Sequence, residues 1–540
     1  MPPARPATTI PEALLATLDR ADGGGYAFHL DDGPTTLTYP ELAERAGMAA
    51  RRLVALGVQP GDPIGVLGPN RPEWAIWAFG IWIAGAVLVP VQIPLRVRDP
   101  KAFAEQVRRL VDAAGCRRVL ADPRLAPLLP EQIAVPWDQP RDESWEGRTP
   151  PSAESLAVIQ FTSGSTSAPK GAAITHSAVM AQMEVLRTGY RYPDGTPRSV
   201  LGWTPFFHDL GLFANVVHPV VAGSTMHHLP TERFARDPTE WLRLIGETRV
   251  AGTIAPSSGF GKAVRTAVRR GVPVDMSALE GAYFAAEGVD PDAVQRMLED
   301  ARAFGLTADK LGASYGLAEA VMAVSYTRVG DGTRLDRVST DALAEAGVAA
   351  PAENGRSRLV VGCGKPLMDV RIVGPDGELA ERGVGEILVR GSSMMSGYIG
   401  EAAHDPFVDG WLRTGDLGYL ADGELYPTGR AKDMMIAMGH NYYPEDFEWA
   451  AGRHPQVRPG RCVAFSKPGT GDGDVILLVE SKADTDAKEL RRSVEARVAD
   501  AVGVAPREVI VLPPGTIEKT TSGKLRRAAM RDIYAAGGFR

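Results

Sequence analysis

The sequence has few of the features that mark secreted, fibrous or nucleic-acid-binding proteins. Its 540 residues include three cysteines, Cys116, Cys363 and Cys462. They lie far apart and are odd in number, which argues against a disulfide framework and a zinc cluster. The formal net charge of −7 gives no general attraction to nucleic acid or anionic lipid. A nucleotide site would therefore need its own local positive charges.

We also expect neither a signal peptide nor a membrane-spanning segment. Residues 1–9 have no apolar core of signal-peptide length, so we expect no secretion and a reducing cytoplasm. Residues 74–95 carry no charge over 22 positions, which is long enough to cross a bilayer. However, Gly80 and Gly85 interrupt this stretch, and Pro90 and Pro94 end it. The pattern therefore predicts a core helix followed by a short core strand at 87–89.

The length and composition predict a large globular enzyme. A chain of 540 residues exceeds what one core usually serves, so two or more domains are expected. From residue 37 to 121, strand and helix patterns alternate, beginning with a helix that Thr38 caps and a strand at 63–67. Such alternation predicts an α/β fold with a mainly parallel sheet. Residues 123–151 are rich in proline and acidic residues and predict a surface crossing.

The most informative stretch is 161–171, Phe-Thr-Ser-Gly-Ser-Thr-Ser-Ala-Pro-Lys-Gly, which follows the apolar run 156–159. The loop has four hydroxyl donors, Thr162, Ser163, Ser165 and Thr166. Gly164 allows a tight turn, and Lys170 adds a positive charge. This set is suited to holding a polyphosphate at the end of a strand. It is not a Walker A loop, because Pro169 precedes the lysine and Gly171 follows it. A solvated Ser/Thr-rich connection is the alternative.

Later segments add candidate groups for a substrate and a nucleoside. In 203–211, Trp203 and Phe207 surround the polar pair His208 and Asp209, which predicts a substrate pocket, with a plain aromatic core as the alternative. In 314–319, Tyr315 offers a stacking face and Glu319 a hard oxygen ligand.

Further groups follow towards the C-terminus. A strand at 282–286 ends in a small-residue turn against which a flat ring could lie. We expect Asp416, in a glycine-bounded turn, to accept hydrogen bonds from a ribose. Residues 429–433 mark a junction, and 518–527 form a basic loop whose alternative role is solubility.

Together and in this order, these segments resemble the acyl-adenylate-forming superfamily of acyl-CoA synthetases, nonribosomal adenylation domains and luciferases. The resemblance covers about residues 37–527. It implies an α/β fold: a large N-terminal domain of two βαβ-type subdomains plus a small β-barrel-like subdomain, then a small mobile C-terminal α+β domain. The implied boundaries are 1–429, a hinge at 430–432 and 433–540.

The resemblance also assigns roles to residues. The 161–171 loop resembles the phosphate loop, and Trp203, Phe207, His208 and Asp209 the acyl-pocket motif. The implied adenine and nucleoside groups are Ala286, Glu287, Gly288, Ser314, Tyr315, Gly316, Asp416 and Arg430. Glu319 and Thr166 would hold Mg2+, Lys432 would be the hinge, and Lys524 the mobile catalytic lysine. Among the implied catalytic residues are Lys524, Glu319, Thr166 and His208.

Within this superfamily the likeness is greatest to fatty acyl-AMP ligases. The His208-Asp209 pair, Ala318 where most members have threonine, and the polar segment 335–358 are typical of them. In that family the extra segment restrains the small domain and disfavours free CoA. Two departures, Ser167 for a glycine and the missing hydroxyl at Ala318, leave open whether adenylation is efficient.

The implied function is the ATP-dependent activation of a carboxylic acid, fatty or otherwise apolar, as acyl-AMP. The acyl group then passes to the phosphopantetheine thiol of a carrier protein or CoA, as in fatty acid or natural-product biosynthesis. An acyl-CoA ligase and an enzyme that uses a preformed acyl-AMP remain alternatives, as does a non-catalytic binding module on the same fold. No nucleic acid partner is expected.

Overall fold

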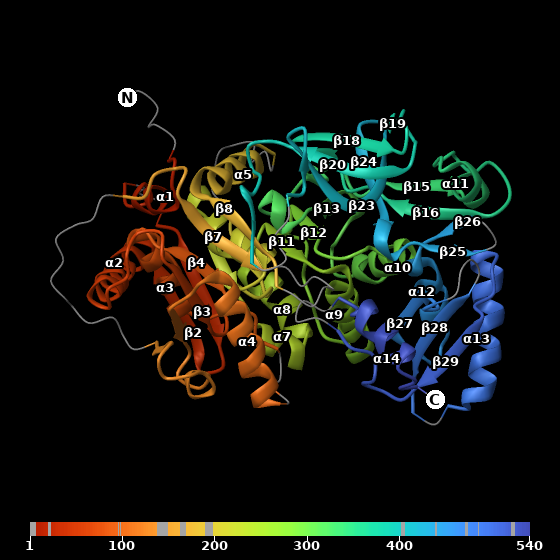
Figure 1. The fold of residues 1–540 in the computed structure, drawn as a ribbon, viewed down its shortest axis with the longest axis horizontal. Coiled ribbons are helices and arrows are strands. Elements are labelled where there is room, and N and C mark those ends of the chain that lie inside the picture. Colours follow the sequence, from red (N-terminus) through yellow and green to blue (C-terminus); the bar gives the residue numbers. More distant parts are fainter. Residues whose placement is uncertain are drawn as a thin grey trace. The chain divides into compact units, whose positions relative to one another are not determined.

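A computed structural model describes residues 7–19, 23–94, 97, 99–137, 150–161, 169–189, 198–400, 405–437, 440–469, 474–483, 485–519 and 524–539. The chain divides into two compact units (Figure 1). Unit 1 comprises Met1–Ala286, Val294–Thr333 and Arg390–Pro406; unit 2 comprises Glu287–Ala293, Arg334–Val389 and Phe407–Arg540. The mixed α/β class predicted from the sequence is confirmed. The predicted domain boundary at 430–432 falls inside unit 2 and remains a prediction.

The first sheet of unit 1 carries the strands that flank the predicted phosphate loop. Its order is β21 (Gly397–Ile399), β8 (Gly171–Thr175), β7 (Leu156–Phe161), β4 (Val87–Pro90), β3 (Pro63–Leu67), β5 (Arg118–Ala121) and β6 (Ala134–Pro136). The pairs among β3 to β7 are parallel, as predicted, whereas β8 runs antiparallel to both β7 and β21. A strand from the far segment Arg390–Pro406 therefore pairs beside the loop.

The helices beside this sheet follow from local sequence signals. Helix α2 (Tyr39–Ala55) begins with a capping box in which the side chains of Thr38 and Glu41 bond each other's backbone N–H groups. Helix α3 (Pro72–Ile83) has twelve residues, and the stretch predicted as core helix and strand forms α3 and β4, both largely buried. No helix in the described ranges is long and apolar enough to cross a membrane.

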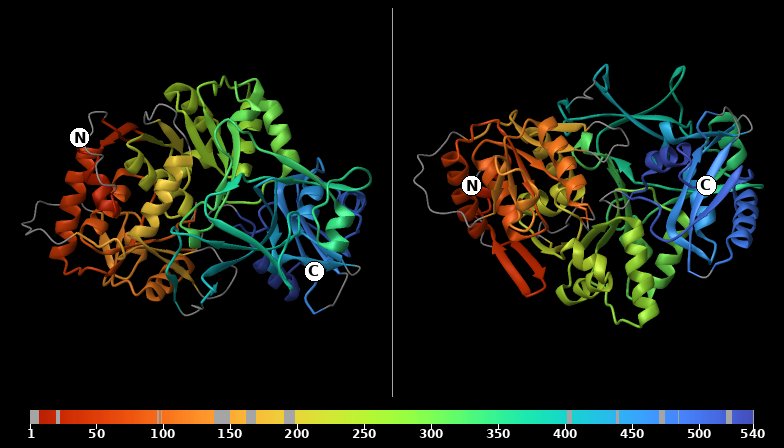
Figure 2. Two further views of the ribbon diagram at one scale, coloured as in Figure 1. Left: turned by 90° about the horizontal axis from the view of Figure 1, so that it is seen from above. Right: turned by 60° about the horizontal axis from the view of Figure 1, so that its bottom comes forward.

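The second sheet of unit 1 holds the predicted substrate and adenine segments. Its unit 1 strands are ordered β14 (Ser325–Tyr326), β13 (Leu311–Tyr315), β12 (Gly281–Phe284), β11 (Gly252–Ala255), β9 (Val200–Gly202), β10 (Thr225–His228), β1 (Gly25–Leu30) and β2 (Gly33–Thr38). The right view of Figure 2 shows the β1–β2 hairpin in red. Helices α7 (Thr231–Arg236), α8 (Thr239–Thr248) and α9 (Ser257–Arg270) accompany the strands of this sheet in the chain. Helices α4 (Pro100–Ala114) and α5 (His176–Gly189) instead pack with strands of the first sheet.

The helical segment after the His208-Asp209 pair has an unusual geometry. Residues Leu210–Val217 form a π-helix, and α6 (His218–Ala222) continues it. Pro219 has no N–H to give to the carbonyl four residues earlier, that of Asn215, so the ordinary α-helical bond cannot form there. A π-helical stretch of this kind often occurs at functional sites, and this one follows the His208-Asp209 pair directly.

The first part of unit 2 is β-rich. Strands β15 (Leu335–Ser339) and β16 (Ser357–Val361) flank α11 (Thr340–Ala346) and pair antiparallel. A further sheet contains β19 (Gly377–Glu378), β18 (Asp369–Gly374), β20 (Gly385–Arg390), β23 (Trp411–Ala421) and β22 (Phe407–Val408), with β24 (Glu424–Arg430) paired to β23. The predicted extra segment, 335–358, thus lies within an ordered hairpin, 335–361, whose two strands are connected through a short helix.

The C-terminal part of unit 2 is a three-stranded sheet of β27 (Val457–Ser466), β28 (Val475–Ser481) and β29 (Glu508–Leu512). Alternate strand residues point to opposite faces. Leu477 packs with α12 (Pro444–Gly452) and α13 (Ala487–Val502), whereas Ile476 and Leu478 pack with Met530 of α14 (Arg527–Ala535). Helices therefore cover both faces of this sheet (Figure 1). A short ribbon of β25 (Met435–Ala437) and β26 (His440–Tyr442) precedes it.

One buried imidazole makes the fold sensitive to acid. His228, at the end of β10, is 0% exposed, and neither ring nitrogen reaches a hydrogen-bond partner among the described residues. Its ring stacks on Phe28 at 4.9 Å and meets Phe206 edge-on at 4.5 Å. Burial in this aromatic box lowers the pKa of His228 to about 3. The folded chain therefore keeps this imidazole neutral at a pH at which the unfolded chain binds a proton.

We expect the free energy of unfolding to decrease as the pH falls, because of His228. Between about pH 6.5 and pH 3, protonation of His228 favours only the unfolded chain, by about 1.4 kcal/mol per pH unit. His228→Leu should remove this slope. Urea unfolding of wild type and variant at several pH values measures the difference, in which the titrations of groups that do not interact with His228 cancel. A difference that stays constant from pH 7 to pH 4 would contradict the assignment.

Candidate functional site

The predicted phosphate loop lies between β7 and β8. Its residues 162–168, among them Thr162, Ser163, Gly164, Ser165 and Thr166, fall outside the described residues. Lys170 is described, directly before β8, with its Nζ 5.8 Å from the centre of the Tyr398 ring. This places the cation of the loop beside strand β21, which pairs with β8 through Tyr398 and Ala172.

Glu319 also belongs to unit 1, where it lies in a short 3-10 turn from Ala318 to Ala320. The Tyr398 hydroxyl donates a hydrogen bond of 2.6 Å to Glu319 Oε1. The Met395 N–H donates to the Glu319 carbonyl over 2.8 Å. Segment 395–398 thus holds both the backbone and the side chain of the predicted metal ligand.

The turn that presents Glu319 is strained. Val321 has φ 64° and ψ −60°, and the Met322 N–H donates across it to Ala320 O over 2.7 Å. Positive φ is rare for a β-branched residue and costs of order 1–3 kcal/mol. Close packing maintains the turn, since a Cβ at Gly316 would lie 1.7 Å from the Met322 carbonyl oxygen. Backbone strain of this kind clusters at functional sites.

The predicted nucleoside residues of unit 1 lie on neighbouring strands. Ser314 and Tyr315 end β13, and the Ser314 hydroxyl donates to Ser325 O over 3.0 Å. Ala286 follows β12 and has φ 70°, the left-handed conformation that suits a tight turn. Its neighbours Glu287 and Gly288 belong to unit 2. Strands β12 and β13 pair in parallel, so their carboxyl ends meet at one edge of the sheet.

The acyl-pocket motif after β9 is fixed by amides from elsewhere in unit 1. Asn70 donates to Thr204 O over 2.8 Å and accepts from the Phe206 N–H over 2.9 Å. Gln160 donates to Phe207 O over 2.9 Å. Because both amides are buried, they hold the backbone of the motif in one conformation.

The polar pair of this motif is internally satisfied. His208 Nδ1 lies 2.5 Å from Asp209 Oδ1, and both side chains are largely buried. The Leu210 N–H donates to Asp209 Oδ1 over 2.6 Å. The cost of burying two polar groups, which motivated the substrate-pocket prediction, is therefore met by their mutual contact, and their role in binding remains a prediction.

The apolar part of the motif is an aromatic stack. Trp203 lies flat on Phe234, with ring centres 3.6 Å apart and planes within 5°. A Cβ at Gly259, in the first turn of α9, would lie 2.7 Å from the Trp203 ring. Phe206 and Phe207 are also buried. These aromatic side chains are therefore packed in the interior of unit 1, and their role in binding an acid remains a prediction.

In unit 2, the prediction for Asp416 needs a correction. Asp416 does not lie in a turn but within β23, where it pairs with Arg430 of β24. Its Oδ1 forms an ion pair with Arg430, whose Nε lies 2.9 Å away. Glycine at 415 and 418 suggested a turn, but Gly415 adopts a φ of 70° inside a strand that continues to Ala421. The two predicted nucleoside-binding residues are therefore direct neighbours.

Lys524 follows the undescribed residues 520–523, which Lys519 and Leu525 flank as an antiparallel β-bridge. Burial, and next the charge of Arg461, lower the pKa of Lys519, whereas Glu287 and Glu480 oppose them. Lys524 itself is exposed. The predicted catalytic lysine therefore lies on unit 2, directly before the bridge residue Leu525.

Arg527, three residues after Lys524, connects the start of α14 with the residue that follows the predicted hinge. Its guanidinium lies 2.8 Å from Asp433, which follows Lys432, and 3.0 Å from both Glu445 and Glu448 of α12. Glu448 also accepts from the Ala464 N–H over 2.9 Å. Burial opposes the charged form, but the carboxylates, led by Glu448, raise the pKa of Arg527. Lys432 lies in the 3-10 turn between Arg430 and Asp433.

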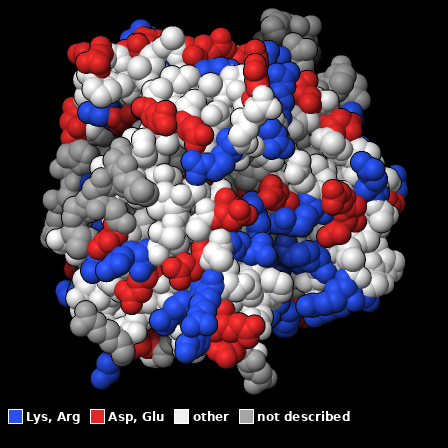
Figure 3. All heavy atoms as spheres, turned by 90° about the vertical axis from the view of Figure 1, so that its right-hand side faces the viewer, with Lys and Arg blue, Asp and Glu red and all other residues white. Residues whose placement is uncertain are grey.

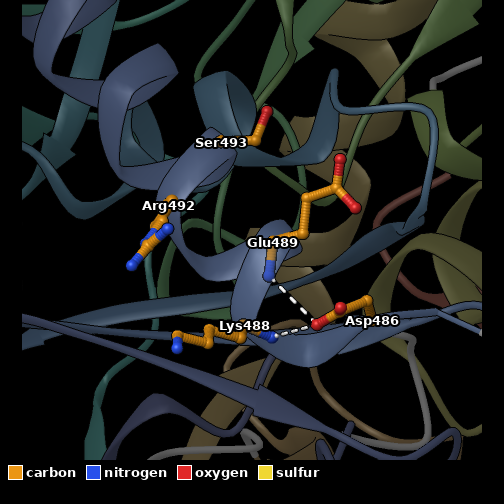
Figure 4. Close-up of a pocket in the computed structure, with 5 residues that line it drawn as sticks. All are labelled: Asp486, Lys488, Glu489, Arg492 and Ser493. Carbon is orange, nitrogen blue, oxygen red and sulfur yellow. Dashed lines mark hydrogen bonds between the residues drawn. The ribbon is translucent and has the colours of Figure 1, made fainter.

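A hollow on unit 2 is lined by residues outside the predicted site. This hollow at the start of α13 is lined by Asp486, Lys488, Glu489, Arg492 and Ser493 (Figure 4), where Asp486 caps the helix by accepting from Lys488 and Glu489 N–H groups. On the face drawn in Figure 3, basic side chains lie beside acidic ones. That face offers no uniformly positive surface to nucleic acid.

Asn70, Gln160 and Tyr398 are site residues that the sequence analysis missed. Asn70 lies in the short loop between β3 and α3, and a polar residue just after a core strand is a signal that could have found it. Gln160 is a polar residue inside an apolar strand, which is a similar signal. Tyr398 gave no such signal in the sequence, because its partner Glu319 is 79 residues away.

Known proteins match nearly the whole chain. Residues 20–399 match the family model described as AMP-binding enzyme. Rv1013 of Mycobacterium tuberculosis, which is named only as a ligase, is 36% identical over 513 residues, covering 92% of this chain and 94% of that protein. JamA of Moorena producens, a medium-chain-fatty-acid–acyl-carrier-protein ligase, is 29% identical and covers 93% of this chain and 90% of its own length.

A solved structure from a study of fatty acyl-adenylate ligases from E. coli and L. pneumophila has a similar fold. It superposes with a TM-score of 0.89 at 29% identity and covers 99% of both chains. The similarity thus extends through both units rather than over the nucleotide-binding part alone.

Proposed function

Since the chain belongs to the family of AMP-binding enzymes and is an AMP-forming ligase, we propose that it activates an apolar carboxylic acid as acyl-AMP and transfers the acyl group to a phosphopantetheine thiol. The acid attacks the α-phosphorus of ATP and pyrophosphate leaves. The thiol then attacks the acyl carbonyl, and AMP leaves. The named activity of JamA and the fatty acyl-adenylate ligase fold support this order of steps.

The observation that carries the proposal is the arrangement around Tyr398 in unit 1. One tyrosine contacts both Lys170, the cation at the end of the hydroxyl-rich loop, and Glu319. A phosphate-binding cation and a carboxylate for a hard metal ion are the groups that a leaving pyrophosphate requires.

Mg2+ fits this carboxylate. Oε1 of Glu319 is oriented by Tyr398, whereas Oε2 has no hydrogen bond or ion pair within the described ranges. Such a carboxylate oxygen is a preferred Mg2+ ligand, and Thr166 would be the second protein group. When bound, Mg2+ would neutralise the charge of the pyrophosphate.

The remaining predicted residues bind and orient the substrates. Asp416 would accept hydrogen bonds from the ribose, with Arg430 holding its carboxylate. Tyr315 and the turn at Ala286 would contact the adenine. Lys524 would donate to the carboxylate and the α-phosphate, where negative charge increases in the transition state. A rotation about Lys432 would then remove Lys524 from the reacting groups before the thiol arrives.

The acid and the acceptor follow from separate observations. The Trp203–Phe234 stack favours an apolar chain or ring, and the name of JamA favours a carrier protein over free CoA as the source of the thiol. His208 and Asp209 lie at the start of the π-helix and would contact the reacting end of the acid.

The test is ATP–pyrophosphate exchange with a panel of fatty, aryl and polycyclic acids. We expect exchange that depends on one class of apolar acid, because adenylation is reversible once the acid binds. Thioester formation is then measured with a phosphopantetheinylated carrier protein and with free CoA.

The rival functions give other results in the same assays. No exchange, together with thioester formation from synthetic acyl-AMP, would show an enzyme that uses a preformed adenylate. Neither activity with any acid would favour a binding module and contradict the proposal.

A further inference from the structure

We infer that Tyr398 is a positioning residue of the adenylation step: its hydroxyl orients the Glu319 carboxylate and its ring holds the Lys170 ammonium. This inference rests on the proposed function, in which Glu319 is a metal ligand and Lys170 binds phosphate. The tyrosine itself contacts neither substrate in the scheme above and acts through these two groups.

The backbone fixes the place of Tyr398 independently of its side chain. Strand β21 pairs with β8 through three residue pairs, with Tyr398 opposite Ala172 and Ile399 opposite Gly171. The Ser396 N–H and hydroxyl both donate to Ala173 O, over 2.8 and 3.1 Å. This side chain therefore starts from a rigid strand next to the end of the phosphate loop, which is the kind of support that precise sites need.

The hydroxyl acts on the glutamate. Tyr398 donates to Oε1 at 2.6 Å, a short distance typical of an O–H bond to a charged carboxylate. Without this donor, the side chain of Glu319 would be free to rotate, since no other hydrogen bond or ion pair holds it in the described part of the chain. A group that holds a metal ligand in this way commonly changes metal affinity by 10- to 100-fold when removed, roughly.

The ring acts on the lysine. An ammonium within about 6 Å of an aromatic ring centre is attracted to its face, and Lys170 Nζ lies at 5.8 Å. The two interactions use different parts of the tyrosine, so they can be separated by substitution. Tyr398→Phe removes only the hydroxyl, and Tyr398→Leu removes the ring as well.

A role in packing alone is the competing explanation, and it predicts loss of folding rather than loss of metal. Tyr534 supplies a matched control. Its hydroxyl also bonds a glutamate, Glu508 Oε2 at 2.8 Å, on the exposed face of unit 2. Tyr534→Phe therefore removes the same kind of bond at a place with no predicted site residue.

The experiment measures Mn2+ binding, in place of Mg2+, by electron paramagnetic resonance of the full chain with a non-hydrolysable ATP analogue. The amount of Mn2+ bound is divided by the folded fraction of each variant, which thermal unfolding measures. We expect Tyr398→Phe to weaken Mn2+ binding by roughly 10- to 100-fold and to leave the KM for the acid unchanged. Tyr398→Leu should additionally raise the KM for pyrophosphate in the exchange reaction.

The variants separate failure of this inference from failure of the proposed function. If Glu319→Gln leaves Mn2+ binding unchanged, the metal role of Glu319 is wrong and the proposed function loses its metal site. If Glu319→Gln weakens binding but Tyr398→Phe matches wild type and Tyr534→Phe, the role of Tyr398 is overturned while the proposed function stands.

Discussion

Lys524→Ala is expected to slow acyl-adenylate formation by roughly 100- to 1000-fold, as the loss of one electrostatic donor does at other transition states. The reason is that negative charge increases between the carboxylate and the α-phosphate, where the ammonium would lie. The thioester step from synthetic acyl-AMP should change much less, because the lysine has left by then. Single-turnover release of pyrophosphate and of AMP measures the two steps separately.

The matched control is Lys488→Ala, which removes an exposed lysine from α13 of the same unit. Both half-reactions should remain near wild type in this variant. Unchanged pyrophosphate release in Lys524→Ala would show that this lysine has no catalytic part in adenylation. Equal losses in both half-reactions would instead indicate a general structural defect.

Arg527→Ala should lower the free energy of unfolding by about 3–5 kcal/mol, the cost of leaving a buried charge without its partner. The guanidinium is 14% exposed and Glu448 is 7% exposed, so water cannot replace the lost contacts. Asp433 and Glu445 would also lose their ion pairs. Urea unfolding at pH 7 provides the measurement.

Arg526 offers a control at the neighbouring position. Its pair with Glu518 is exposed, at 53% and 44%, so Arg526→Ala should cost less than about 1 kcal/mol. Adding Glu448→Gln to Arg527→Ala should recover part of the loss, because the uncompensated buried charge is then gone. Equal effects of the two arginine substitutions would mean that the carboxylate cluster contributes little to stability.

The parts of the fold that could be predicted are those with local signals. Thr38 and Glu41 stand three residues apart and form the predicted cap of α2, and Gly85 separates the uncharged stretch into helix and strand. The acyl motif could be located for a similar reason, because its residues are adjacent in the chain.

What could not be predicted depends on contacts between distant segments. Asp416 looked like a turn residue because glycines flank it, but pairing with β24 draws it into a strand. The π-helix depends on which backbone carbonyls accept hydrogen bonds from which N–H groups. The spacing of apolar residues does not reveal that pattern. Tyr398 became a site residue only because β21 returns from a distant segment to pair with β8.

That return path limits how the chain can be divided. The sheet order begins β21-β8-β7, so β21 is the edge that covers β8. A chain cut before Arg390 would lose this strand and leave a row of backbone N–H and C=O groups of β8 open to other molecules, the usual starting point of edge-to-edge aggregation. Unit 1 is therefore not a fragment that one cleavage can release, and its N-terminal portion needs the segment Arg390–Pro406 to cover the β8 edge and to hold the Glu319 side chain.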